Sequence, residues 1–124
     1  MKYLCLVYLD ENRLNELPDE DCVAYDTAIR NSGQCLASEA LQSVQTATTV
    51  RVRNDSITIT DGPFAETKEQ LSGFYMIDAK DLDDAIHIAS NIPPAKVGSI
   101  EIRPIRLIRE TVAARRSGEA QDIN

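Results

Sequence analysis

The segment Lys2–Leu9 restricts the possible folds more than any other part of the chain, because it is apolar on both sides. It reads KYLCLVYL, which is typical of a β-strand. Successive strand residues point to opposite faces of a sheet, so two apolar sets face apart: Tyr3, Cys5, Val7 and Leu9 on one side, and Leu4, Leu6 and Tyr8 on the other. A sheet with one face in water shows alternating polar residues instead. The sequence therefore predicts a strand that is covered on both faces.

Two amphipathic helices are predicted, each with recognisable ends. Pro18 suits a first helical turn and Gly33 the position just past a helix end, which predicts a helix over 18–32. Asp81 is a typical N-cap residue, and Pro93-Pro94 ends the helix that it starts. Apolar residues recur at helical spacing: Cys22, Tyr25, Ala28 and Ile29 on the first helix, and Leu82, Ala85, Ile86 and Ala89 on the second.

The other strands include a hairpin with a defined register. Asn54-Asp55 tolerates left-handed backbone and favours a two-residue turn between residues 48–53 and 56–60. That register places Val52 opposite Ile57 and Val50 opposite Ile59, so that the apolar residues share one face. Further strands are predicted over 34–41, 73–78 and 99–108, and residues 65–72 are predicted to be irregular.

The resulting order, β-α-β-hairpin-β-α-β, predicts a ferredoxin-like α+β fold with an inserted hairpin and both helices on one sheet face. Residues 1–109 would form this domain, and 110–124 a polar tail that is helical at most as far as Arg116. Helices on one face leave the apolar second face uncovered, and monomers seldom expose such a patch. We therefore expect a homodimer with two antiparallel sheets packed face to face, as in a dimeric α/β barrel.

Composition argues against several functional classes. The chain has 124 residues, a net charge of −7 and 5% aromatic residues, so direct nucleic-acid binding is not expected. No segment has the length of a membrane span or a signal peptide, which predicts a cytoplasmic protein. The three cysteines lack CxxC spacing and are expected to be buried thiols. One histidine among scattered carboxylates predicts no metal site, and no cofactor is expected.

Several charged residues stand out as candidates for a site. Glu101 and Arg103 alternate with Ile100 and Ile102 in the last strand, so they would point at the covered face, either as a structural ion pair or as part of a polar site. Glu39 is alone in the apolar strand over 34–41. The segment 61–69, DGPFAETKE, combines a constrained turn, an aromatic residue and several charges.

This segment carries a resemblance to a known family. DGPFAETKEQLSGFYMID and GSIEIRPI, with the MKYLCLVY start and the LDDAIHIASNIP helix, resemble the YCII-related or DGPF-domain family. The resemblance covers the chain to about Ile108 and implies a dimeric α/β barrel, a superfamily that includes small-molecule oxygenases and degradative enzymes. A His–Asp pair serves as acid and base in the wider group, whereas the sole histidine here, His87, falls on the wet side of its helix.

The resulting hypothesis is a small-molecule pocket formed by the dimeric barrel, in which carboxylates act as acid and base. Asp61 and Glu66 are the candidate catalytic residues. The candidate ligand-binding residues are Phe64, Lys68, Glu39, Glu101 and Arg103. Two alternatives stay open. One is an accessory module that acts through protein contacts, linked by the resemblance to extracytoplasmic-function sigma factors, and the other is a purely structural role for the DGPF segment. No motif decides whether the protein is an enzyme.

Overall fold

The structure, a computed structural model, describes residues 1–118. Its strands are β1 (Lys2–Leu9), β2 (Cys35–Ala40), β3 (Thr48–Arg53), β4 (Ser56–Asp61), β5 (Gln70–Asp78) and β6 (Ser99–Pro104). The helices are α1 (Asp19–Asn31), α2 (Leu82–Ser90) and α3 (Ile108–Ser117). Short 3-10 helices η1 (Glu11–Glu16), η2 (Val44–Thr46) and η3 (Pro93–Lys96) lie in the connections.

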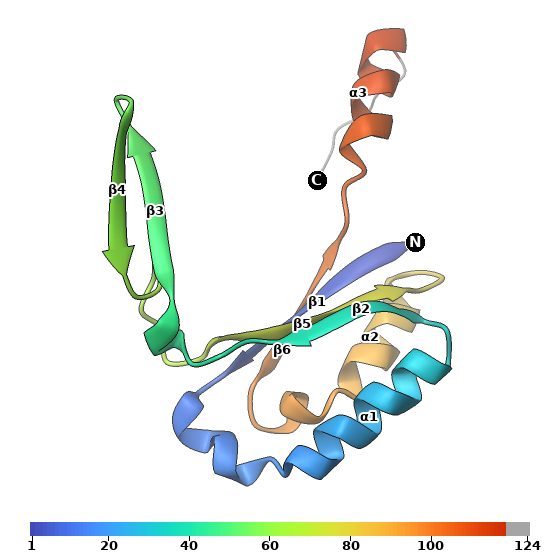
Figure 1. The fold of residues 1–124 in the computed structure, drawn as a ribbon. Helices are drawn as coiled ribbons and strands as arrows, with labels where there is room; N and C mark the ends of the chain where they lie inside the picture. The colour runs from blue at the N-terminus through green and yellow to red at the C-terminus, as the bar shows by residue number, and fades with distance from the viewer. Residues whose placement is uncertain (119–124) are drawn as a thin grey trace.

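The main sheet has the strand order β2-β5-β1-β6, and every neighbouring pair is antiparallel. Helices α1 and α2 cover the same face of this sheet (Figure 1). This arrangement confirms the ferredoxin-like fold with an inserted hairpin. Gly33, just past α1, has a φ of 80°, and the Asp81 side chain accepts a hydrogen bond from the Asp84 amide, as expected from the helix-end signals.

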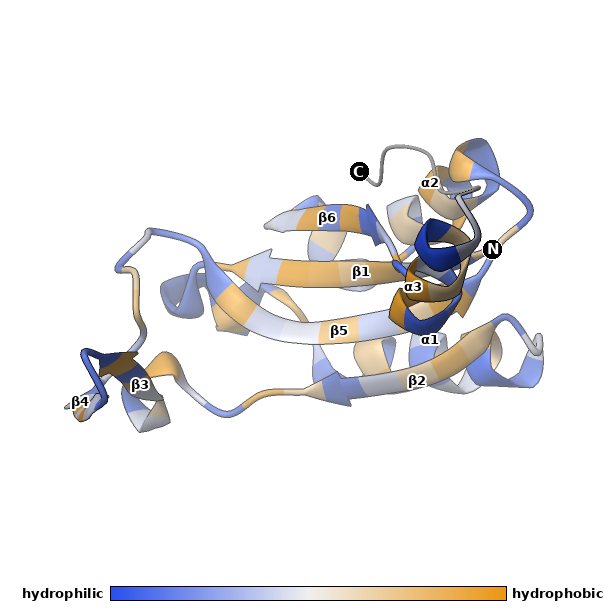
Figure 2. Cartoon of the chain, turned by 90° about the horizontal axis from the view of Figure 1, so that it is seen from above, coloured by the Kyte–Doolittle hydropathy of each residue, from blue (hydrophilic) through white to orange (hydrophobic). Residues whose placement is uncertain are grey.

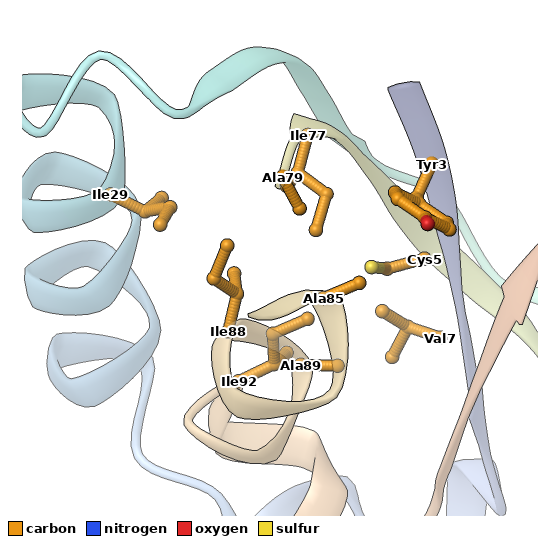
Figure 3. Close-up of a cluster of buried hydrophobic side chains, with 10 residues drawn as sticks. All are labelled: Tyr3, Cys5, Val7, Ile29, Ile77, Ala79, Ala85, Ile88, Ala89 and Ile92. Atoms are coloured by element: carbon orange, nitrogen blue, oxygen red, sulfur yellow. The ribbon is translucent and has the colours of Figure 1, made fainter. Parts of the chain in front are cut away.

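The hydrophobic core lies between the sheet and the two helices (Figure 3). Tyr3, Cys5 and Val7 of β1 point into it and are buried, as the alternation predicted. Ile77 from β5 is fully buried beside them. The helices contribute Ile29 from α1 and Ala85, Ile88 and Ala89 from α2, and Ile100 and Ile102 of β6 pack against this cluster.

The thiol of Cys5 makes stability sensitive to alkaline pH. Burial, with a smaller contribution from nearby Cys35, raises the pKa of Cys5 from 9.0 to about 11. Because the folded protein holds this proton more tightly than the unfolded chain, the stabilisation is complete below pH 9 and is lost towards pH 11, by an order of 2–3 kcal/mol. Urea titrations should show a smaller loss of stability between pH 9 and 11 in Cys5→Ala than in the parent; equal slopes would contradict this.

The face of the sheet opposite α1 and α2 is apolar along its centre, and neither of these helices covers it (Figures 1 and 2). Leu4 pairs with Met76 and Leu6 with Phe74 across β1 and β5. On the other side of β1, Glu101 lies beside Leu6 and Arg103 beside Leu4. We call this side of the sheet, opposite α1 and α2, the open face. Glu101 and Arg103 do point to it, as predicted from the alternation of β6.

Two arms rise from the sheet on the side of the open face (Figure 1). The first is the β3–β4 hairpin, a separate two-stranded sheet. Its register is the predicted one, with Val52 opposite Ile57 and Val50 opposite Ile59. Asn54 and Asp55 in its turn have φ values of 51° and 63°, as such a turn requires. The second arm is α3.

Three local predictions were wrong. The last strand ends at Pro104, not at residue 108, and α3 starts at Ile108. The reason is that β1 begins at Lys2, whose carbonyl accepts a hydrogen bond from the Ile105 amide, so residues 106–108 have no partner on β1. Strand β5 starts at Gln70, inside the segment predicted to be irregular, since Gln70 and Leu71 pair with β1 through their backbones. On α2 the buried residues are Ala85, Ile88 and Ala89, whereas Leu82 and Ile86 are exposed. The division into a domain over 1–109 and a tail over 110–124 remains a prediction. Helix α3 spans the proposed boundary, and residues 119–124 lie outside the described residues.

Among residues 1–118, no helix combines the length and apolar character that crossing a membrane requires.

Candidate functional site

A cavity of about 740 Å³ lies between α1 and the sheet, next to β2 and β5. Its walls are mainly apolar: Leu14 and Leu17 lie on one side, Val23 on α1, and Leu41 and Tyr75 on the sheet side. The volume falls within the range of about 300–1,000 Å³ that is usual for small-molecule sites. The cavity is therefore the candidate binding site of this chain.

A cluster of polar side chains, Asp26, Arg30 and Ser38, borders the cavity. Asp26 and Arg30 are one helical turn apart on α1, and Arg30 Nε donates to Asp26 Oδ2 at 2.9 Å. Ser38, only 6% exposed, lies on β2 and donates from Oγ to Asp26 Oδ1 at 2.7 Å. Arg30 Nη2 also donates to Ser38 Oγ at 2.6 Å and to the Ser38 carbonyl at 3.0 Å.

This cluster joins helix and edge strand, and it leaves groups that a ligand can use. The Asp26 carboxylate has lone pairs beyond those that accept from Ser38 and Arg30. Charge-assisted hydrogen bonds of this kind are stronger than neutral ones, so the cluster holds its geometry. A ligand hydroxyl in the cavity can donate to Asp26, and a ligand oxygen can accept from the remaining guanidinium hydrogens of Arg30.

Neutral hydrogen-bonding side chains line or support the same cavity. Burial, with the nearby Asp26, raises the pKa of Tyr75 to about 12. Tyr25 packs edge-on against Tyr75, with ring centroids 5.6 Å apart, and burial raises its pKa as well. Burial and the carboxylates of Asp19 and Asp21 raise the pKa of Cys22. At neutral pH these groups are therefore phenols and a thiol, which suits binding and not nucleophilic attack.

At one end of the cavity, hydrogen bonds join η1 to the start of η2. Glu11 accepts hydrogen bonds from Ser43 Oγ at 2.9 Å and from the Val44 amide at 2.8 Å. Both Glu11 and Ser43 line the cavity. Arg13, bound to Glu16, donates to the Val97 carbonyl at 3.0 Å and ties η1 to the segment after η3. These contacts give the cavity a wall made of irregular segments with fixed positions.

Of the residues predicted from sequence, only Glu39 lines this cavity. Glu101 and Arg103 form an exposed ion pair on the open face, with Oε2 and Nη1 3.3 Å apart. The remaining candidates, Asp61, Phe64, Glu66 and Lys68, lie at the end of β4 and in the connection to β5. Within residues 1–118 their side chains make no hydrogen bond or ion pair, and none of them borders the cavity.

The DGPF turn itself is fixed to the base of the hairpin by two hydrogen bonds at Gly62. Gly62 has a φ of 99°, a conformation that favours glycine. Its amide donates to the Ala47 carbonyl at 2.7 Å, and Thr49 Oγ1 donates to the Gly62 carbonyl at 2.8 Å. Phe64, two residues after Gly62, remains 79% exposed. The aromatic side chain of this turn therefore finds no packing partner among the described residues.

The sequence prediction did not include Asp26, Arg30 and Ser38. A signal existed for the first two, because an Asp–Arg pair at i, i+4 beside an apolar stripe indicates charges next to a packed surface. Ser38 gave no such signal, since a serine in a weak strand is common. Among residues 1–118, no three His, Cys, Asp or Glu side chains are grouped closely enough to hold a metal ion.

The fold and the cavity define a class of protein: a ferredoxin-like α+β chain with an apolar, ligand-sized site between one helix and the sheet. The YCII-related domain model matches residues 1–109, and the chain belongs to this family. It is 35% identical over 118 residues to "Uncharacterized protein R00369" of Rhizobium meliloti (strain 1021), covering 88% of this chain and 95% of the relative.

A solved structure shares the fold. It is 5-chloro-2-hydroxyhydroquinone dehydrochlorinase (TftG) from Burkholderia phenoliruptrix AC1100, in complex with 2,5-dihydroxybenzoquinone. The TM-score is 0.54, with 11% sequence identity, and the match covers 86% of this chain and 94% of the other. At this identity the similarity establishes the fold alone.

Proposed function

We propose that this protein binds a small, single-ring organic molecule with hydroxyl or keto oxygens in the cavity between α1 and the sheet. The observation that carries the proposal is the combination of an apolar cavity of about 740 Å³ with the Asp26–Arg30–Ser38 cluster at its border. Apolar walls with a few fixed polar groups are typical of small-molecule sites. The structural neighbour, bound to 2,5-dihydroxybenzoquinone, supports the choice of ligand class.

Within this proposal, Asp26 is the carboxylate that accepts a hydrogen bond from a ligand hydroxyl, and Arg30 faces a ligand oxygen. Acid–base catalysis by a carboxylate would require contact with the proton to be moved. The assignment of Asp61 and Glu66 to that role remains a prediction, as do the ligand-binding roles of Phe64 and Lys68. The alternative role as an accessory module for sigma factors also remains a prediction.

The proposal is tested by blocking the cavity with a tryptophan. Leu41 borders the cavity and is 49% exposed, while Leu36, 47% exposed on the same strand segment, does not. Because Leu41 is partly exposed, Leu41→Trp should fill part of the cavity without overpacking the core. Leu36→Trp is the matched control. With 2,5-dihydroxybenzoquinone and simple hydroquinones as probes, calorimetry should show binding to the parent and to Leu36→Trp. Binding to Leu41→Trp should be at least about tenfold weaker.

Two results would contradict the proposal. One is the absence of binding and of any shift in Tm across a panel of such probes at millimolar concentration. The other is equal affinity of the Leu41→Trp and Leu36→Trp variants, since binding would then lie elsewhere. Circular dichroism of both variants checks that the tryptophan has not altered the fold.

We also propose that a second copy covers the open face. Leu4, Leu6, Phe74 and Met76 form a continuous apolar strip across its central strands. Two sheets of this kind pack about 10 Å apart and bury the strip. The Glu101–Arg103 pair lies at the border of the same face, where it can form hydrogen bonds across the contact. Its test is the first prediction of the Discussion.

A further inference from the structure

The two arms above the open face carry apolar surfaces that the single chain leaves in water. On the hairpin, Val50, Val52, Ile57 and Ile59 share one face and are between 56% and 69% exposed. On α3, Ile108 and Val112 are one turn apart and exposed, and Leu107 precedes them. Among the described residues, neither arm forms an extensive contact with another helix or strand of the chain.

Neither arm is expected to be stable in isolation. A two-stranded hairpin without further packing is at best marginally stable in water, and so is a helix as short as the 10 residues of α3. Each arm therefore needs a partner surface. The arms cannot supply it to each other within one chain, because they rise at opposite ends of the sheet (Figures 1 and 2).

The strand order places the two arms at diagonally opposite corners. The hairpin follows the end of β2, at one edge, and α3 follows the end of β6, at the other edge. Since β2 and β6 run antiparallel to each other in this sheet, their carboxyl ends lie at opposite ends of it. Consider two copies whose open faces meet, with a two-fold axis that runs between the sheets and is perpendicular to the line joining the two arms. Rotation about this axis places the hairpin corner of one copy over the α3 corner of the other. Each hairpin then stands beside the partner's α3, and both contacts form at once.

The lengths are compatible with this exchange. A strand of 6 residues, the length of β3 and β4, spans about 20 Å. Facing sheets are about 10 Å apart. A hairpin that extends from one sheet towards the partner therefore reaches beyond the partner's sheet. The partner's α3 extends in the opposite direction, so the two arms lie alongside each other over part of their lengths.

We infer that the β3–β4 hairpin of each copy packs its Val50, Val52, Ile57 and Ile59 face against Leu107, Ile108 and Val112 of the partner's α3. The inference rests on the proposed dimer and specifies its contacts. The interface is isologous, so a closed pair results and no open chain of copies. The open faces pack at the centre, and the two arm pairs enclose them at diagonal corners. The polar face of the hairpin, with Arg51 and Arg53, stays in water.

A charge placed on the apolar face of the hairpin tests the inference. Ile57→Asp would bury a carboxylate twice in each dimer, which should weaken dimerisation about a hundredfold, tenfold for each of the two contacts. Thr58→Asp, the next residue and on the opposite hairpin face, is the control and should dimerise like the parent. Because Ile57 is exposed in the single chain, the variant should keep its circular dichroism spectrum. Sedimentation equilibrium measures both constants.

A cross-link identifies the partner surface directly. In a background with Cys22→Ser and Cys35→Ser, Val52→Cys combined with Val112→Cys should give a covalent dimer with a short thiol cross-linker, and much less of it with either cysteine alone. A parent dimer in which Ile57→Asp has no effect and no such cross-link forms would overturn the arm exchange and leave the dimer intact. A monomeric parent would overturn the proposed dimer itself, together with this inference.

Discussion

Replacing Leu6 by aspartate should convert the protein from a dimer to a monomer at micromolar concentration. Leu6 lies at the centre of the open face, between Phe74 of β5 and Glu101 of β6. In the proposed dimer the new carboxylate would be buried twice, each time beside the charge of Glu101, and burying unpaired charges costs several kcal/mol. We expect dimerisation to weaken about a thousandfold or more.

The control and the readout separate assembly from folding. Thr27→Asp adds the same charge on the exposed side of α1 and should leave the dimer unchanged. Light scattering coupled to size exclusion gives the mass, which is 13.7 kDa for one chain. A Leu6→Asp protein that remains dimeric, with the same dissociation constant as the Thr27→Asp variant, would show that the open face is not the contact surface.

Replacing Gly98 by alanine should destabilise the fold by about 3 kcal/mol, because two strands approach each other there without space for a methyl group. A β-carbon on Gly98 would overlap with the backbone carbonyl of Tyr8. A backbone atom cannot move aside as a flexible side chain does, so β6 or β1 must shift. The loss of stability comes from a disturbed pairing of β1 with β6, which places Ile100 and Ile102 against the core.

Gly33→Ala provides the matched control for this substitution. Gly33 has a φ of 80° and no atom near the position of an added β-carbon, so alanine there costs only the backbone strain, about 1 kcal/mol. Urea unfolding of both variants measures the difference. If Gly98→Ala loses no more stability than Gly33→Ala, the start of β6 does not lie as close to β1 as the structure describes.

The possible chemistry of the cavity depends on side chains that stay protonated. Raised pKa values keep Tyr75 and Cys22 protonated at neutral pH, and beside them Asp26 and Arg30 form an ion pair. Such a site favours a ligand that both donates and accepts hydrogen bonds. It differs from a site built on an imidazole, because the only histidine of the chain, His87, is exposed on α2.

Much of the fold could be predicted because its signals are local. The double-sided apolar pattern of Lys2–Leu9, the helix-end residues Gly33 and Asp81, and the Asn54-Asp55 turn each act within a few residues. Where local polarity disagreed with the backbone pairing, as at the start of β5, the prediction failed. Pairing with β1 is decided by a strand far away in sequence, and polar side chains do not prevent it.

The sequence by itself determined the order of the elements, the two apolar faces of β1 and the family. Only the tertiary structure decided where the candidate site lies. Asp26 and Ser38 are 12 residues apart on different elements, and they meet because α1 packs across β2 at a particular height and rotation. Such packing depends on the whole core, whereas periodicity reports only which side of an element is apolar. The same reason explains why the DGPF segment, the most distinctive string in the sequence, lies at the base of an arm and does not border the cavity.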